Sequence, residues 1–205
     1  MSKTQVARLK ITLDHVDPVV MRRVVVPLNM RLHRLHTLVQ VAMGWSGGHL
    51  WAFVARGVEW GPREPGGDFR DGPLDASKAR LDDALDCVGT KTIKYIYDFG
   101  DGWQHTIKVE RLFPAVSGLD LPFLLDAIGR CPPEDIGGPA AYMELLTAVA
   151  DAKHPRHADA IELLGVGFKP SAVDARALEK AVDELASRWA RPSRMPKTAT
   201  GRRAA

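Results

Sequence analysis

The segment from Tyr95 to Glu110 alternates apolar and polar side chains on both sides of a glycine-rich bend, which predicts two antiparallel strands joined by a tight turn. A two-residue loop would place apolar residues opposite polar ones. A three-residue loop, Gly100-Asp101-Gly102, keeps one face apolar and gives Gly102 the left-handed conformation that such a turn requires. This register pairs Phe99 with Trp103, Tyr97 with His105, Tyr95 with Ile107 and Ile93 with Val109.

The predicted apolar face contains one histidine, His105. We expect it to be half-buried, packed across from Tyr97 and hydrogen-bonded there, and a metal-binding or acid–base role is the alternative. Asp98 and Asp101 lie at the turn, where aspartate is common because its short carboxylate accepts hydrogen bonds from local amides.

The charge distribution separates the chain into two parts. The net charge is +3, but the last fifteen residues carry five cations and no acid, so residues 1–190 have a net charge of −2. These cations are Arg191, Arg194, Lys197, Arg202 and Arg203. We therefore predict one domain over residues 1–190 and a flexible basic tail over 191–205. Nucleic acid is expected to bind, if at all, through this tail only.

Other features of the composition limit the class of protein. No apolar run approaches the length of a membrane span, and the N-terminus lacks the apolar core of a signal peptide, so we expect a cytoplasmic protein with no membrane partner. The two cysteines, Cys87 and Cys131, form no Cys-x-x-Cys pair. Reduced thiols are expected rather than a zinc or redox motif.

Hydrophobic periodicity predicts an α+β fold. The order ββαβ, a short helical turn and then ββ indicates a mixed or antiparallel sheet covered on one face by a helix, in a grasp-like arrangement followed by C-terminal helices. The predicted strands are 5–14, 19–26, 50–60 and the two of the hairpin. The predicted helices are 30–43, 81–85, 119–128, 140–152, 155–164 and 174–191. Residues 61–78 are rich in glycine and proline and are expected to form a flap.

Several motifs occur in one order along residues 5 to about 175. They are Arg22-Arg23, Leu35-His36, Gln40, Met43-Gly44-Trp45, His49-Leu50, Tyr95-x-Tyr-Asp-Phe-Gly-Asp-x-Trp-x-His105 and Cys131-Pro-Pro-Glu-Asp-x-Gly-Gly138. In these motifs the chain resembles the plasmid pRiA4b ORF-3-like family, also labelled insertion-element passenger TnpR proteins. The resemblance implies a fold and a link to mobile elements. It implies no established activity.

The chain departs from the family pattern at three places. Met21 stands where tryptophan is usual, Ala141 replaces a glycine, and Leu163-Leu164 replaces Trp-Leu. These departures suggest adjusted packing and affect no polar residue proposed below.

The segment Cys131-Pro-Pro-Glu-Asp-Ile-Gly-Gly-Pro139 is predicted to be a rigid loop that holds two carboxylates in place. Together with the hairpin it offers a candidate set of ligands for a divalent cation, the one cofactor that the sequence suggests. The set comprises Asp98, Asp101, His105, Glu134 and Asp135, with His49 or His36 as further candidates. The alternatives are that Glu134 or Asp135 caps a helix, and that His33 and His36 bind a metal on their own helix.

Aromatic residues near the same motifs predict a groove for a ligand or a protein partner. Its candidate residues are Trp45, His49, Tyr97, Trp103 and His105. The leading hypothesis is a non-enzymatic accessory or binding domain. The alternatives are a metal-dependent hydrolase or nuclease that uses the carboxylate–histidine set, and weak nucleic-acid binding through the tail. The triplet Asp98-Phe99-Gly100 matches the magnesium-binding triplet of protein kinases, but the chain has none of the other kinase motifs.

Overall fold

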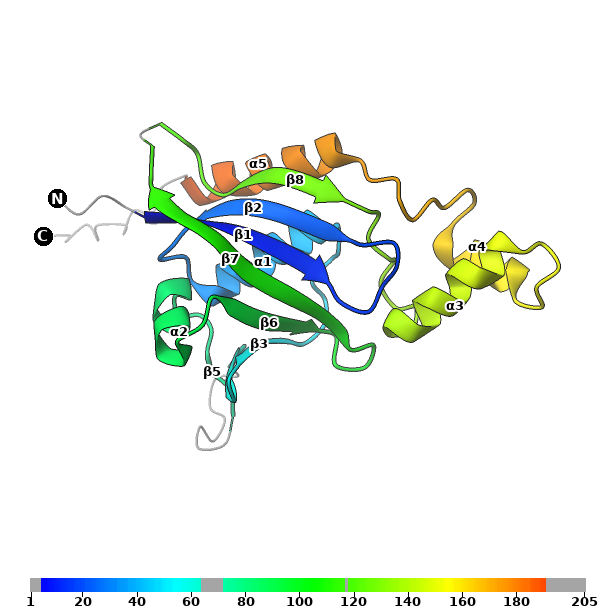
Figure 1. Cartoon of the computed structure of the whole chain (residues 1–205), viewed down its shortest axis with the longest axis horizontal. Coiled ribbons are helices and arrows are strands. Elements are labelled where there is room, and N and C mark those ends of the chain that lie inside the picture. Colours follow the sequence, from blue (N-terminus) through cyan, green and yellow to red (C-terminus); the bar gives the residue numbers. More distant parts are fainter. Residues whose placement is uncertain (1–4, 64–71, 117, 191–205) are drawn as a thin grey trace, which may run out of the picture.

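The computed structural model describes residues 5–63, 72–116 and 118–190. In this part of the chain, eight strands form one mixed sheet, accompanied by five helices (Figure 1). The strands are β1 (Gln5–Leu13), β2 (Met21–Pro27), β3 (Trp51–Ala55), β4 (Val58–Gly61), β5 (Leu74–Asp75), β6 (Thr92–Tyr97), β7 (Trp103–Pro114) and β8 (Phe123–Ile128). The helices are α1 (Leu32–Met43), α2 (Leu81–Val88), α3 (Gly138–Ala150), α4 (His157–Leu164) and α5 (Ala175–Ala190).

The sheet has the strand order β5-β4-β3-β6-β7-β1-β2-β8. Neighbouring strands are antiparallel except β4 and β5, which are parallel. Helices α1 and α5 lie together behind the sheet, whereas α3 and α4 lie beyond one end of the strands (Figure 1). The predicted α+β fold, with a mixed sheet, a covering helix and C-terminal helices, is confirmed.

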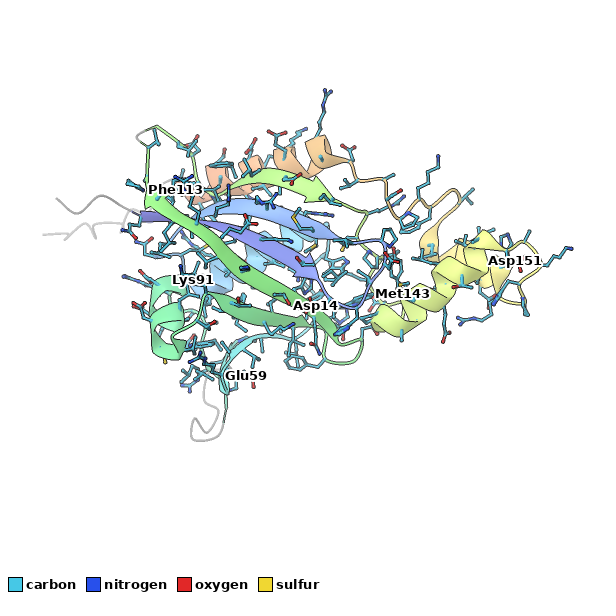
Figure 2. The ribbon with its side chains drawn as sticks, viewed as in Figure 1. Asp14, Glu59, Lys91, Phe113, Met143 and Asp151 are labelled. Carbon is cyan, nitrogen blue, oxygen red and sulfur yellow. The ribbon has the colours of Figure 1, made fainter. Side chains whose placement is uncertain are left out.

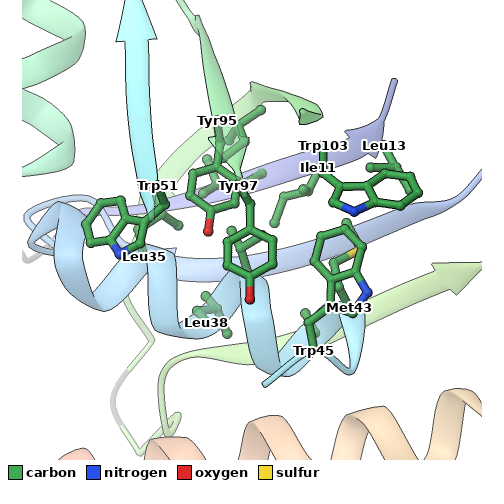
Figure 3. Close-up of a cluster of buried hydrophobic side chains, with 14 of the residues drawn as sticks. Ile11, Leu13, Leu35, Leu38, Met43, Trp45, Trp51, Tyr95, Tyr97 and Trp103 are labelled. Atoms are coloured by element: carbon green, nitrogen blue, oxygen red, sulfur yellow. The ribbon is translucent and has the colours of Figure 1, made fainter. Parts of the chain in front are cut away.

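The core lies between the sheet and α1. The helix presents an apolar stripe to the sheet and ends at Gly44, whose φ of 86° is the left-handed conformation of a helix C-cap. Figure 3 shows the aromatic side chains of β3, β6 and β7 gathered with Trp45 around Leu35, Leu38 and Met43. Each fully buried leucine contributes about 1.5–3 kcal/mol to folding.

A buried arginine, Arg22, ties the end of α1 to the sheet. Its guanidinium donates to the carbonyl oxygen of Ala42 (2.7 Å) in the last turn of α1. It also donates to the carbonyl oxygens of Met21, Ile128 and Gly129. Because carbonyl groups at a helix C-terminus carry partial negative charge, they compensate a buried cation without a carboxylate.

The β6–β7 hairpin has a different register from the predicted one. Tyr97 pairs with Trp103, and Tyr95 pairs with His105, so the loop contains five residues rather than three. The side chain of Asp98 explains the wider loop, since its Oδ1 accepts from the amides of Gly100 (3.0 Å) and Asp101 (3.3 Å). The predicted three-residue turn is wrong.

The error in register is two residues, and a shift of two keeps each side chain on its own face. Tyr95, Tyr97, Trp103 and His105 are therefore all buried on the predicted face. Phe99, which was predicted to belong to the apolar row, lies in the loop and is 54% exposed. The predicted left-handed Gly102 is confirmed, with a φ of 68°.

Two further predicted elements are wrong. The region predicted as a helix over 119–128 contains β8, which pairs with the edge of β2 and contacts α5. Its apolar residues satisfy a helical pattern as well as a strand, and pairing with β2 decides between them. The single strand predicted over 50–60 is a hairpin, because Arg56 and Gly57 both have positive φ and reverse the chain between β3 and β4.

The C-terminal helices agree with the predictions. Asp174 caps α5, since its Oδ1 accepts from the amide of Ala177 (3.0 Å). Figure 2 shows Met143 of α3 near the end of β1, where its Sδ accepts from the amide of Asp17 (3.3 Å). Residues 64–71 of the predicted flap and the whole predicted tail (191–205) lie outside the described residues.

His105 is fully buried in this core and lies opposite Tyr95, so the predicted half-buried histidine opposite Tyr97 is wrong. Its ring lies 5.3 Å from the ring of Tyr95 and 5.4 Å from that of Trp45. Neither ring nitrogen makes a well-formed hydrogen bond within the described residues. Burial lowers the pKa of His105 from 6.5 to about 4, and the nearby backbone of Tyr95 and charge of Asp14 offset only part of the effect.

This environment predicts a specific acid sensitivity. Because the pKa is depressed in the folded state, the unfolded chain binds the proton more tightly, and stability falls as the pH drops from 6.5 towards 4. His105 should contribute about 3 kcal/mol to this loss, on the scale of 1.36 kcal/mol per pKa unit. The variant His105→Leu should lose correspondingly less free energy of unfolding over the same interval, as measured by urea denaturation at a series of pH values.

The comparison isolates His105, because His36, whose pKa burial also lowers to about 4, titrates in both proteins. Equal pH dependence in the wild type and the variant would contradict a neutral, desolvated His105.

Candidate functional site

Three loops meet at one end of the sheet: the β6–β7 loop, the segment 44–50 between α1 and β3, and residues 131–137 before α3. The closest approach is between Asp101 and Gly138, where a Cβ atom would overlap the carbonyl oxygen of Asp101. The amide of Gly137 donates to Asp101 Oδ2 (3.1 Å). In Figure 1 the β6–β7 loop lies beside the start of α3. Only glycine at position 138 lets the two loops come this close.

The three loops contribute one side chain each to a carboxylate–histidine cluster. Nδ1 of His49 lies 3.6 Å from Oδ2 of Asp98, and its Nε2 lies 3.1 Å from Oδ1 of Asp135. One ligand atom of each residue falls within 4.8 Å of the other two. The Asp98 side chain is 14% exposed and that of Asp135 is 72% exposed, so the cluster is anchored on one side and open to solvent on the other.

Both aspartates have a left-handed backbone conformation. The φ angle is 54° at Asp98 and 61° at Asp135. This conformation costs roughly 1–2 kcal/mol for most residues, although aspartate and asparagine adopt it more readily than others. Such strain is concentrated at binding and catalytic sites, where it sets the direction of a side chain.

The two carboxylate oxygens of Asp98 have separate roles. Oδ1 accepts from the amides of Gly100 and Asp101 and so holds the loop, whereas Oδ2 faces His49. The oxygen that faces the cluster is therefore not needed for the loop. The loop also fixes the position of Oδ2, and a preorganised metal ligand has to be held in place in this way.

Glu134 lies next to the cluster and is held by three hydrogen bonds. The hydroxyl of Tyr97 donates to Oε1 (2.5 Å), and the amide and hydroxyl of Ser46 donate to Oε2 (2.7 Å) and Oε1 (3.2 Å). Burial alone would raise the pKa of Glu134, but these hydrogen bonds outweigh it and lower the pKa. Burial and the bond to Glu134 raise the pKa of Tyr97 to about 12. This pair joins the core to the loop that carries Asp135.

A buried polar network lies deeper in the molecule. Gln40 Nε2 donates to the hydroxyl of Tyr95 (2.8 Å), so that hydroxyl uses its own hydrogen towards Nδ1 of His36 (2.7 Å). The His36 ring stacks on Trp51 at 4.1 Å, with an angle of 7° between the planes. Burial, and then the charge of His33, lower the pKa of His36 to about 4. His36 is therefore neutral and engaged within the core.

The structure brings together some of the predicted metal ligands. Asp98 and Asp135 meet at His49, which the sequence had offered with His36 as a further candidate ligand. Glu134 is adjacent but engaged by Tyr97 and Ser46. Asp101 is on the same loop as Asp98 but bonds to Gly137.

Other predicted residues lie apart from the cluster. His105 is enclosed by aromatic rings in the core. His33, three residues before His36, also does not join it, since the cluster comprises only His49 and two aspartates among the described residues.

The predicted groove residues have two different settings. Tyr97, Trp103 and His105 are almost completely buried, and Trp45 is 7% exposed, so these four form the floor beneath the loops. His49 alone of the five reaches solvent to a substantial extent. Sequence reasoning missed Ser46, whose position directly after Trp45 gave no signal of a bond to Glu134.

A cavity of about 490 Å³ is lined by Glu134, the residue that precedes Asp135, and by Trp45. Its other walls come from the end of α1, the Cys131–Pro133 segment, Phe168 and the start of α5. Burial raises the pKa of the Cys131 thiol, so this cysteine stays protonated and does not act as a nucleophile at neutral pH. Small-molecule sites commonly have this size.

Among the described residues, no helix combines the length and the apolar character needed to cross a membrane.

Comparison with known proteins places the chain among relatives without an assigned activity. The family model described as "Plasmid pRiA4b ORF-3-like protein" matches residues 5–177. "Uncharacterized protein y4hQ" of Sinorhizobium fredii is 52% identical over 190 residues, which are 92% of this chain and 96% of that protein. The crystal structure of a protein of unknown function, MM3350 from Methanosarcina mazei Go1, has a TM-score of 0.75 at 29% identity. The match covers 85% of this chain and 98% of the other.

The contact between the loops predicts different effects of two glycine substitutions. Gly138→Ala and Gly102→Ala both place a side chain at positive φ, which costs about 1 kcal/mol. A Cβ at Gly102 meets no atom within 4 Å, whereas one at Gly138 overlaps Asp101. Gly138→Ala should therefore cost about 1–3 kcal/mol more than Gly102→Ala in the free energy of unfolding. Similar losses in urea titrations of the two variants would show that the loops do not depend on this contact.

Proposed function

The chain belongs to the plasmid pRiA4b ORF-3-like protein family, and from its geometry we propose that it is a binding domain whose loops hold a divalent transition-metal ion between His49, Asp98 and Asp135. The observation that carries the proposal is the convergence of one imidazole and two carboxylates, from three separate loops, within 4.8 Å. Two left-handed aspartates and a close glycine contact maintain this convergence.

The donor set suits one class of ion. Zinc binds imidazole nitrogen and carboxylate oxygen at about 2.0–2.2 Å, so ligand atoms on opposite sides of an ion are roughly 4.2 Å apart. One ligand atom of each of the three residues lies within 4.8 Å of the other two, so small side-chain movements bring the set into this range. An imidazole donor favours Zn²⁺, Mn²⁺ or Fe²⁺ over Mg²⁺ and Ca²⁺, which prefer oxygen alone. Two carboxylates balance the charge of the ion.

Three protein donors leave at least one coordination position for water or for a ligand. The side chain of Asp135 is 72% exposed, and the cavity of about 490 Å³ that the preceding residue Glu134 lines offers room for the rest of a small ligand. A metal ion that presents an open position beside such a cavity supports the predicted role in ligand binding.

The surroundings favour binding over metal-dependent hydrolysis, the alternative raised by the sequence. Hydrolysis needs a carboxylate or histidine that is free to move a proton near the ion. The nearest further carboxylate, Glu134, accepts three hydrogen bonds, and its lowered pKa makes it a poor base. Association with mobile elements, nucleic-acid binding by residues 191–205 and a cytoplasmic location stay predictions of the sequence.

The decisive variants are Asp98→Asn and Asp135→Asn. Asparagine tolerates the left-handed conformation, and at position 98 it keeps an oxygen for the amides of Gly100 and Asp101. Each substitution removes one charged donor and leaves the loop intact. In calorimetric titrations with MnCl₂ or ZnCl₂, the wild type should bind one ion, and each variant should bind it at least about tenfold more weakly.

Asp101→Asn is the matched control, because it lies in the same loop and its acceptor role towards Gly137 is one that an amide oxygen can fill. It should bind the ion as the wild type does. A wild type that binds no ion at millimolar concentration, or binding that survives both Asp98→Asn and Asp135→Asn, would remove the proposal.

A further inference from the structure

A second feature lies at the N-terminal end of α1, a helix of twelve residues that is about 18 Å long. Here Arg31, Arg34 and Arg80 line one open pocket of about 620 Å³. His33 and Ser77 also line it, and Met30, Leu121 and Trp189 provide apolar walls. No aspartate or glutamate is among the lining residues in the described part of the chain.

The fold holds these three cations close together. Arg31, which directly precedes α1, and Arg80 face each other in an isolated antiparallel bridge, and Arg34 lies in the first turn of α1. Like charges in both arrangements repel and destabilise the fold. Within the described residues, none of the three forms an ion pair that would offset this repulsion.

The guanidinium groups keep most of their hydrogen-bonding capacity. Arg31 donates one hydrogen bond to the carbonyl oxygen of Ser77, and Arg34 lies over the ring of Trp189 at 5.2 Å from its centroid. Arg80 makes no side-chain hydrogen bond or ion pair among the described residues. Each arginine side chain carries five N–H donors and one positive charge. The pocket therefore presents many unpaired donors and a charge of +3 from the three guanidinium groups.

The arginine charges also act on the pKa of the neighbouring His33. Burial is the main cause that lowers the pKa of His33, and the charges of Arg34 and Arg31 lower it further, while the backbone of Ala76 and the charge of Asp75 offset part of the effect. Its Nδ1 is buried and has no hydrogen-bond partner among the described residues. The pocket is therefore cationic around a neutral imidazole.

We propose that this arginine pocket binds single-stranded nucleic acid, with backbone phosphate at Arg31 and Arg80 and a base against the apolar wall at Trp189. Guanidinium groups bind phosphate in a bidentate manner, and bases of single strands stack on aromatic side chains. A duplex, whose bases are already stacked, has no base to offer this wall.

The sequence beyond the pocket favours a polymer over a single phosphate. Ala190 lines the pocket, and the chain continues from it into fifteen residues that contain five cations and no acid. A strand of repeated phosphates gains from each further cation through the release of counterions, whereas a lone phosphate does not. This inference is independent of the metal site and assigns nucleic acid to the folded part of the chain.

The test uses the full chain and a fluorescent fifteen-nucleotide oligothymidylate, followed by fluorescence anisotropy at several salt concentrations. The double variant Arg31→Gln with Arg80→Gln keeps a side-chain donor for Ser77 and removes two charges. It should bind about tenfold more weakly at low salt and lower the magnitude of the salt slope by about 1.4, which is two contacts at 0.7 each.

The control is the double variant Arg176→Gln with Lys180→Gln, which removes the same charge from exposed positions near the start of α5. It should bind with less than about a twofold change in affinity. Equal binding by the two double variants overturns the proposal, because cations elsewhere would then carry the affinity.

Two competitors distinguish the source of the phosphate. Unlabelled oligothymidylate should displace the probe far better than inorganic phosphate at the same phosphate concentration, and better than a duplex of the same length. If inorganic phosphate displaces the probe as effectively as the oligonucleotide does, the assignment to a polymer is overturned. If the duplex displaces it equally well, the assignment to a single strand is overturned.

Discussion

The close approach of the Asp101 carbonyl to Gly138 is the constraint on which the candidate site depends. It brings a hairpin loop against the loop that precedes α3, although the two are more than thirty residues apart in the chain. Through this contact Asp98 and Asp135 reach the same histidine. Any side chain at position 138 would separate them.

Hydrogen bonds connect the hydrophobic core to the candidate site. The hydroxyl of Tyr97 extends from the buried aromatic layer to Glu134, and Ser46 holds the same carboxylate from the loop after α1. The loop that carries Asp135 is thus fixed to rigid secondary structure. This support maintains the left-handed backbone conformation of Asp98 and Asp135. Such a conformation is expected where the backbone determines the direction in which a ligating side chain points.

The sequence was sufficient for the fold class and for the buried face of the hairpin, because alternation of apolar residues determines which side of a strand faces the core. It was insufficient for the register, since a shift of two residues leaves the alternation unchanged and the amide bonds of Asp98 decide the loop length. It was also insufficient for β8, where pairing with β2 outweighs a helical pattern. Asp98 and Asp135 could be named as candidates, but their meeting at His49 depends on contacts between distant loops that one sequence does not encode locally.

Crystals of the protein soaked in MnCl₂ and measured at a wavelength where manganese scatters anomalously test the central claim most directly. The account predicts one strong anomalous peak about 2.0–2.2 Å from a nitrogen of His49 and from carboxylate oxygens of Asp98 and Asp135. A map with no peak between these three residues, or with its strongest peak at acidic residues elsewhere on the surface, would contradict it.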